Sequence, residues 1–171
     1  MSGTQKISGG TLLVAGIVGG FISAMVKSGT EDILPPRLPG VTPPPLQMLN
    51  AVGLHASHMN YTYSAQSVNW GGNGVHILFS IVIAVIYCFL VRRNKVFAIW
   101  AGIPFGVIVA FGAHSFVLPL LGIGKDVLFG PFEGLASELF GTILWIWTIE
   151  CFRRYFVART RVNFTQFEPG N

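Results

Sequence analysis

The sequence contains an apolar stretch at residues 74–91, GVHILFSIVIAVIYCFLV, that has no Asp, Glu, Lys or Arg. A transmembrane α-helix needs about 20 predominantly apolar residues, so this stretch predicts a membrane span. Three further stretches meet the same criterion, at residues 8–27, 97–121 and 135–152. The sequence therefore predicts an all-α integral membrane protein, with four transmembrane helices in a bundle that forms a single membrane domain over residues 1–171.

The composition excludes the soluble classes of protein. Of the 171 residues, 51% are hydrophobic and 11% are Asp, Glu, Lys or Arg, and the mean hydropathy is +0.60. A soluble domain carries about 25% charged residues, so this chain lacks the polar surface to cover a water-soluble core. Disorder is excluded as well, because it requires low hydrophobicity and high charge. The net charge of +4 lies in short clusters beside the apolar stretches, which indicates membrane topology rather than nucleic-acid binding.

The distribution of lysine and arginine predicts the orientation, because these residues are enriched in cytoplasmic loops. With four spans, both termini and the loop between the second and third spans share one side of the membrane. We therefore expect both termini in the cytoplasm, an extracytoplasmic loop at residues 28–73 and a cytoplasmic tail at residues 153–171. The expected cytoplasmic side carries eight basic residues, namely Lys6, Arg92, Arg93, Lys95, Arg153, Arg154, Arg159 and Arg161, and the other side carries three, namely Lys27, Arg37 and Lys125.

The loop at residues 28–73 is rich in proline in its first half. Prolines at 35–36 and 43–45 fix the backbone and remove N–H donors, so this half is predicted to be stiff and extended. Residues 46–54 predict one or two turns of an interfacial helix. Tyr61, Tyr63 and Trp70 are residues of the kind that settle at a membrane interface.

Small residues recur at four-residue spacing in two of the spans. Such rows allow helices to approach closely in lipid, so we interpret them as packing faces. Two of the three rows run into an ionisable residue, Lys27 in the first span and His114 in the third. The rows are Gly16, Gly20 and Ala24, then Ala15, Gly19, Ser23 and Lys27 in the first span, and Gly102, Gly106, Ala110 and His114 in the third.

Ionisable residues gather at a similar depth near the expected outer ends of the spans. A charged group inside the bilayer costs about 2.5–3.5 kcal/mol on insertion scales, so such groups are candidates for function. Four such residues come from four different spans, namely Lys27, His76, His114 and Glu138, and their similar depth predicts a proton-responsive or ion-binding polar cluster. A fifth candidate, Glu133, comes just before the fourth span. The alternative is that each group simply hydrogen-bonds a neighbouring helix or lies in the wet interface.

Other polar residues predict structural roles. Glu150 is followed by Arg153 and Arg154, which predicts an ion pair with Arg154 at the cytoplasmic end. His55 and His58 form only a loose pair, and zinc would require three or four ligands. No catalytic or nucleotide-binding motif is present, so we expect no enzyme, no catalytic residues, no metal and no cofactor. The thiols of Cys88 and Cys151 lie beside arginines on the expected cytoplasmic side and are predicted to be unpaired.

Three strings carry a resemblance to a known family. They are SAMVKSGTEDILPPR at residues 23–37, HILFSIVIAVIYC at 76–88 and SELFGTILWIWTIECFRR at 137–154. In these strings, and also at residues 48–51 (MLNA) and 114–122 (HSFVLPLLG), the chain resembles the YagU-like family of bacterial inner-membrane proteins. The resemblance implies location in the bacterial inner membrane and an association with acid resistance, without an established catalytic activity. It also places Lys27, Arg37, His76, His114, Glu138 and Glu150 at family positions, whereas Thr142 stands where the family is expected to have histidine.

The sequence thus predicts an inner-membrane protein that supports acid or pH tolerance through its polar cluster. A non-catalytic accessory subunit of a larger membrane complex is one alternative, and an oligomeric small channel or transporter is another. Besides the lipid bilayer, we expect the partner to be a second copy of the chain or a larger membrane complex, and not a nucleic acid. The mass of the solubilised complex discriminates between identical subunits and foreign chains.

Overall fold

The structure is a computed structural model that describes residues 7–36, 40–123 and 131–166, with side chains described up to residue 160. Within these residues, four segments are long and apolar enough to cross a membrane, which confirms the predicted all-α membrane fold. The helices of these segments are α1 (Gly9–Ile33), α3 (Trp70–Arg93), α4 (Ile103–Gly112) with its continuation, and α6 (Phe132–Gln166).

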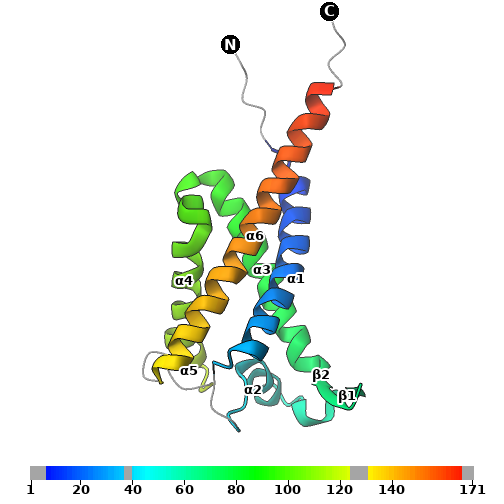
Figure 1. Ribbon diagram of the computed structural model, residues 1–171, viewed down its shortest axis with the longest axis vertical. Coiled ribbons are helices and arrows are strands. Elements are labelled where there is room, and N and C mark those ends of the chain that lie inside the picture. Colours follow the sequence, from blue (N-terminus) through cyan, green and yellow to red (C-terminus); the bar gives the residue numbers. More distant parts are fainter. Residues whose placement is uncertain (1–6, 37–39, 124–130, 167–171) are drawn as a thin grey trace, which may run out of the picture.

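The four segments run up and down, so that the start of α1 and the end of α6 lie at the same end of the molecule (Figure 1). We call this the terminal end. The opposite end, which we call the loop end, carries the short helix α2 (Pro44–Ala51), the hairpin of β1 (Asn60–Tyr63) and β2 (Gln66–Asn69), and α5 (Leu118–Leu120). The arrangement fits an even number of spans, and the side of the membrane that each end faces stays a prediction from the charges.

The first and last helices extend beyond the expected spans. Helix α1 begins after Ser8, whose Oγ accepts a hydrogen bond from Thr11 N at 3.2 Å, and it continues past residue 27 to Ile33. It ends there because the residue before a proline avoids helical backbone angles, and Pro35 follows Leu34. Helix α6 continues past residue 152 to Gln166, so the described part of the expected cytoplasmic tail is helical.

The third span begins later than expected. We predicted a continuous helix from residue 97, but Lys95–Gly102 is a 3-10 segment broken by left-handed backbone angles at Trp100 (φ 47°) and Ala101 (φ 55°). Proline is tolerated only in the first turn of a helix, so a helix that contains Pro104 begins within a residue or two of it, here at Ile103. A π-helical turn at Ala113–Val117 precedes Pro119, where the regular hydrogen-bond ladder is interrupted again.

The predicted rows of small residues are packing faces, and the two rows of α1 serve different neighbours. A Cβ at Gly16 would lie 2.7 Å from Val85 Cα of α3, and one at Gly20 would lie 2.5 Å from Ile81 Cα. A Cβ at Gly19, on the other row, would lie 3.1 Å from Phe152 Cβ of α6. Helix α1 therefore packs closely against both α3 and α6.

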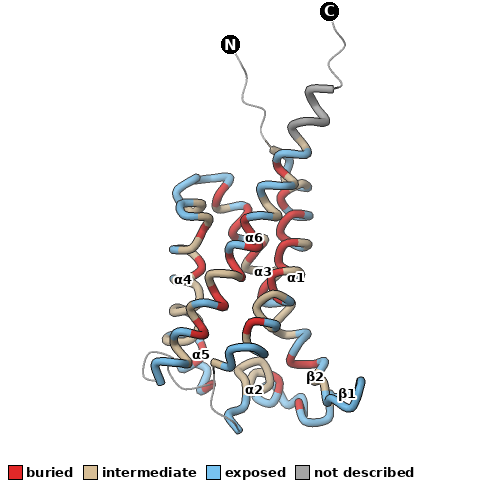
Figure 2. The backbone as a smooth tube through the Cα atoms, viewed as in Figure 1, coloured by how far each residue is buried: buried red, intermediate tan, exposed pale blue. Residues whose placement is uncertain are grey.

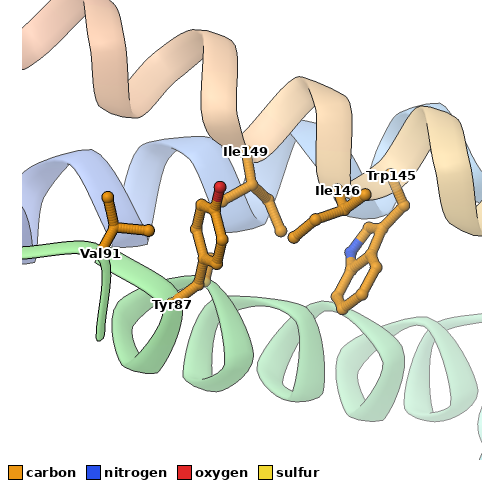
Figure 3. Packing of buried hydrophobic residues seen from close by; sticks show 6 residues of the cluster. Tyr87, Val91, Trp145, Ile146 and Ile149 are labelled. Atoms are coloured by element: carbon orange, nitrogen blue, oxygen red, sulfur yellow. The ribbon is translucent and has the colours of Figure 1, made fainter. Parts of the chain in front are cut away.

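The buried residues concentrate where α1, α3 and α6 meet (Figure 2). One cluster joins α3 and α6 through Tyr87, Val91, Trp145, Ile146 and Ile149 (Figure 3). Helix α4 packs onto its edge, where a Cβ at Gly106 would lie 2.7 Å from Ile146 Cγ2. Dispersion and shape complementarity hold this core together, because lipid supplies no hydrophobic force between helices.

The loop between α1 and α3 contains more regular structure than predicted. Helix α2 agrees with the expected interfacial helix and begins at the prolines, which are tolerated in a first turn. The hairpin that follows was not predicted. Its two-residue turn has left-handed angles at Ser64 (φ 52°) and Ala65 (φ 63°), and Tyr61, Tyr63 and Trp70 are exposed there.

Candidate functional site

Three of the four predicted cluster residues meet at one carboxylate oxygen near the loop end. Lys27 Nζ donates a hydrogen bond to Glu138 Oε1 at 2.8 Å, and His114 Nε2 lies 3.5 Å from the same oxygen. Thr142, one turn further along α6, donates to this oxygen at 3.4 Å. The Lys27 and Glu138 side chains are only 12% and 7% exposed, so the pair is largely shielded from solvent.

Lys27 has a second carboxylate within reach. Glu31 lies one turn further along α1, and its Oε1 is 3.3 Å from Lys27 Nζ. The lysine therefore bridges a carboxylate of its own helix and one of α6. Glu31 was not singled out from the sequence, although its four-residue spacing from Lys27 is the spacing of neighbours on a helix face.

The fourth predicted residue, His76 of α3, lies on the wall of the same cavity rather than in the Glu138 contact. Its ring hydrogen-bonds the backbone of Ala24, and the charges of Lys27, Glu31 and Glu138 act on it. Its Nε2 atom is buried and has no hydrogen-bond partner among the described residues. His76 is therefore a member of the site that holds one uncommitted polar atom.

The cavity has a volume of about 560 Å³ and lies between α1, α2, α3, the α4–α5 segment and α6. The ribbons of α3 and α4 lie closer together near the terminal end than toward the loop end (Figure 1). At their contact, the rings of Tyr87 and Phe105 have centroids 5.1 Å apart. Among the described residues, the ionisable side chains of the cavity wall are Lys27, Glu31, Asp32, His76, His114 and Glu138.

On the side of the cavity toward the terminal end, a buried hydrogen-bond network of hydroxyl groups and one indole joins three helices. Trp145 Nε1 donates to Ser80 Oγ at 2.7 Å, and Ser80 Oγ donates to the Gly20 carbonyl oxygen at 2.8 Å. Ser23 Oγ lies 3.0 Å from Ser80 Oγ. Sequence reasoning did not find this network, because Ser80 is a lone hydroxyl in an apolar stretch.

Glu150 forms a second polar centre, nearer the terminal end. The predicted contact with Arg154 is present, with Arg154 Nε donating to Oε1 at 2.7 Å. Arg153 adds two hydrogen bonds, from Nε at 2.6 Å and from Nη2 at 2.7 Å, and Tyr87 of α3 donates its hydroxyl to Oε2 at 2.9 Å. Glu150 is only 1% exposed. The predicted ion pair with Arg154 is therefore part of a buried carboxylate site with four donor atoms, which ties α3 to α6.

The remaining sequence candidates lie away from the cavity. Glu133 is exposed in the first turn of α6. His55 and His58 have ring centroids 5.7 Å apart, and no group of three or more metal-ligating side chains occurs in the described part of the chain. Neither Cys88 nor Cys151 forms a disulfide. Arg37, Lys6 and Lys125 lie outside the described residues.

Comparison with known proteins gives two matches. Residues 21–151 match the family described as "Protein of unknown function (DUF1440)". The chain is also 30% identical over 165 residues to the inner membrane protein YagU of Escherichia coli (strain K12), which covers 81% of this chain and 80% of the relative. No solved structure matches. All four cavity residues predicted from the sequence lie within the matched segment, and so does Glu150.

Proposed function

The chain belongs to the DUF1440 family and is a multi-pass inner-membrane protein, and on this premise we propose that it supports tolerance of acid outside the cell. The observation that carries the proposal is the contact of His114 with the buried Lys27–Glu138 pair, 3.5 Å from the shared oxygen. Histidine is the side chain whose ordinary pKa, about 6.5, lies in the range of a mild acid shift.

Protonation changes the charge of the cavity. Counted over the residues that the structure describes, one lysine and three carboxylates give the wall a formal charge of −2 while His76 and His114 are neutral, and a formal charge of 0 when both are protonated. A protonated His114 competes with Lys27 for Glu138 Oε1. Lys27 can then pair with the carboxylate of Glu31 instead, whose Oε1 lies 3.3 Å from Lys27 Nζ. Protonation of His114, which lies in the π-helical turn, would thus change which carboxylate Lys27 pairs with. This exchange of partners would shift α1 and α6 relative to the π-helical turn.

The location of the cavity supports this role. The excess of lysine and arginine near the terminal end predicts that the loop end faces the periplasm. Protons that enter the periplasm during acid stress reach the loop end first. The proposal assigns the protein no catalytic reaction and no cofactor.

The proposal is tested by complementation of a strain from which the gene for this chain has been deleted. We expect His114→Gln to lower survival after an acid challenge to that of the deletion strain, because glutamine keeps the approximate shape and cannot be protonated. The matched control is His55→Gln, which removes an exposed histidine of the loop and leaves survival unchanged. Equal amounts of protein in the membrane fraction are required for the comparison. Full survival with His114→Gln would contradict the proposal.

A role as subunit of a homo-oligomer or of a larger membrane complex is the second candidate, and one observation favours it. Only 11% of the residues in the apolar window of Lys95–Leu120 are buried, against 50% for Phe132–Thr160. This segment leaves most of its apolar surface to lipid or to another protein. Native mass measurement after mild solubilisation tests the idea: a multiple of 18.5 kDa indicates identical subunits, foreign chains indicate a larger complex, and a monomer contradicts both.

A further inference from the structure

We propose that the cavity at the loop end is a binding site for an organic cation, specifically a protonated amine that carries an apolar body. The inference goes beyond the proposed function, because it concerns a ligand and requires no protonation of the protein. It rests on the charge, the walls and the volume of the cavity, together with one buried nitrogen atom.

The charge of the cavity favours a cation. With both histidines neutral, the described part of the wall carries the three carboxylates of Glu31, Asp32 and Glu138 and the ammonium of Lys27. The Lys27 ammonium lies between Glu31 and Glu138, and the described residues of the wall together carry a formal charge of −2. A guest with one positive charge reduces this excess, whereas an anionic guest increases it.

The walls favour a guest that is largely apolar. Phe79 and Trp145 line one side, with their rings stacked and their centroids 6.4 Å apart, and Val109 and Leu118 line another. Aromatic faces attract cations as well as apolar groups. The volume of about 560 Å³ lies within the range of roughly 300–1,000 Å³ typical of small-molecule sites.

The buried nitrogen favours a guest with N–H groups. His76 Nε2 lies in the cavity wall without a hydrogen-bond partner among the described residues, and a buried polar atom of this kind is costly unless something pairs with it. A primary ammonium has three N–H donors and a quaternary ammonium has none. Asp32 lines the cavity and is exposed, so the cavity reaches the surface at the end of α1.

The test uses three probes of matched size that differ in charge. We expect 4-phenylbutylammonium to bind the full-length protein saturably at pH 8 in nanodiscs of phosphatidylcholine, measured by equilibrium dialysis. The neutral 4-phenylbutanol should bind about tenfold more weakly, which corresponds to about 1.4 kcal/mol. The anion 4-phenylbutyrate should show only non-saturable partitioning into lipid. Equal binding of the anion and the cation would overturn the proposal.

Two pairs of variants locate the site. Ala113→Trp places an indole in the cavity wall and should abolish saturable binding, whereas Ile108→Trp, at a side chain 71% exposed on the preceding helix, should leave it unchanged. Asp32→Asn reduces the negative charge of the wall by one unit, from −2 to −1, and should weaken binding about threefold. Its matched control is Glu133→Gln, an exposed carboxylate outside the cavity, which should have no effect. Unchanged binding in Ala113→Trp would place the ligand elsewhere and overturn the proposal.

A lipid could supply the same ammonium chemistry, because phosphatidylethanolamine also carries a primary ammonium. Repeating the titration with phosphatidylethanolamine in the nanodisc distinguishes the sources: competition indicates that the headgroup occupies the site, and unchanged affinity indicates a free amine. Both outcomes support an ammonium site. Failure of the probe to bind leaves the acid-survival result for His114→Gln unaffected, so the two proposals fail separately.

Discussion

Replacement of Tyr87 by Phe should destabilise the protein by removing a single hydrogen bond. The Tyr87 hydroxyl donates to Glu150 Oε2 at 2.9 Å, and the two side chains are 0% and 1% exposed, so water cannot replace the lost donor. The ring of phenylalanine keeps the contacts with the core of α3 and α6. The change therefore isolates the hydroxyl group.

The acceptor determines the magnitude. Hydrogen bonds between membrane helices average about 0.6 kcal/mol, with a maximum of about 1.7 kcal/mol. Hydrogen bonds to charged groups contribute about 1.5–3 kcal/mol in proteins generally. The charge of Glu150 favours the higher range, whereas the three arginine hydrogen bonds that remain in the variant favour the lower one. We therefore expect a loss of about 1.5 kcal/mol in the free energy of unfolding, where the two ranges meet.

The assay is reversible unfolding in mixed micelles by a denaturing detergent, followed by circular dichroism. Tyr155→Phe is the matched control, because the Tyr155 hydroxyl accepts a hydrogen bond from Arg159 at the exposed surface and its loss should cost less than about 0.5 kcal/mol. In a Glu150→Gln background the cost of Tyr87→Phe should fall, with a coupling energy of about 1 kcal/mol. A loss below about 0.5 kcal/mol for Tyr87→Phe, or no coupling, would refute the reasoning.

Three further predictions concern packing, titration and orientation. Gly20→Ala should cost about 1–3 kcal/mol in the same unfolding assay, because the added Cβ would lie 2.5 Å from the backbone of α3, whereas Gly29→Ala, with nothing within 4 Å, should not destabilise the protein. Glu138→Gln removes the carboxylate that faces a protonated histidine, so the thermal midpoint of the variant should vary less between about pH 5 and 8 than that of the wild type; an unchanged profile would leave the cluster without a role in titration. In whole cells, an impermeant thiol reagent should label a cysteine at Ser64 and not one at Asn94, and labelling at Asn94 would reverse the predicted orientation.

The helices and their packing rows could be predicted because both depend on patterns local in the sequence. Hydropathy identifies a span, and a four-residue spacing identifies a face, as Gly16 and Gly20 illustrate. The late start of the third helix has one local signal, Pro104, which the hydropathy of the stretch does not reveal. The left-handed backbone angles at Trp100 and Ala101 have none, because L-residues rarely adopt them. The hairpin escaped prediction for the same reason, since Ser64 and Ala65 replace the usual Asn-Gly turn.

The site could be predicted only in part, because depth in the membrane is readable from the sequence and angular position around the bundle is not. The similar depth of Lys27, His114 and Glu138 predicted that they lie close together, and in the structure they meet at one oxygen of Glu138. The same argument grouped His76 with them, and it lines the same cavity, where its ring hydrogen-bonds the backbone of Ala24. Tyr87 was missed as a partner of Glu150 because it comes from a different helix, and spacing within one helix does not reveal which neighbour a face meets.

The double contact of Lys27 has a consequence for biogenesis. A chain is made from its N-terminus, so α1 enters the bilayer before the ribosome has synthesised α6. Helix α1 can pair with α3 as soon as both are inserted, since Gly16 and Gly20 face that helix. The ammonium of Lys27 must wait for Glu138, and an ionisable group in the bilayer costs about 2.5–3.5 kcal/mol meanwhile.

Glu31 can pair with Lys27 before α6 has been synthesised, which shortens the time that the lysine spends without a carboxylate partner. It lies on the same helix, one turn beyond Lys27, and its contact at 3.3 Å needs no other segment of the chain. The nascent α1 therefore arrives in the membrane with its lysine already accompanied by a carboxylate. When α6 is later released from the translocation machinery, Glu138 adds a second carboxylate to a lysine that is already paired with Glu31.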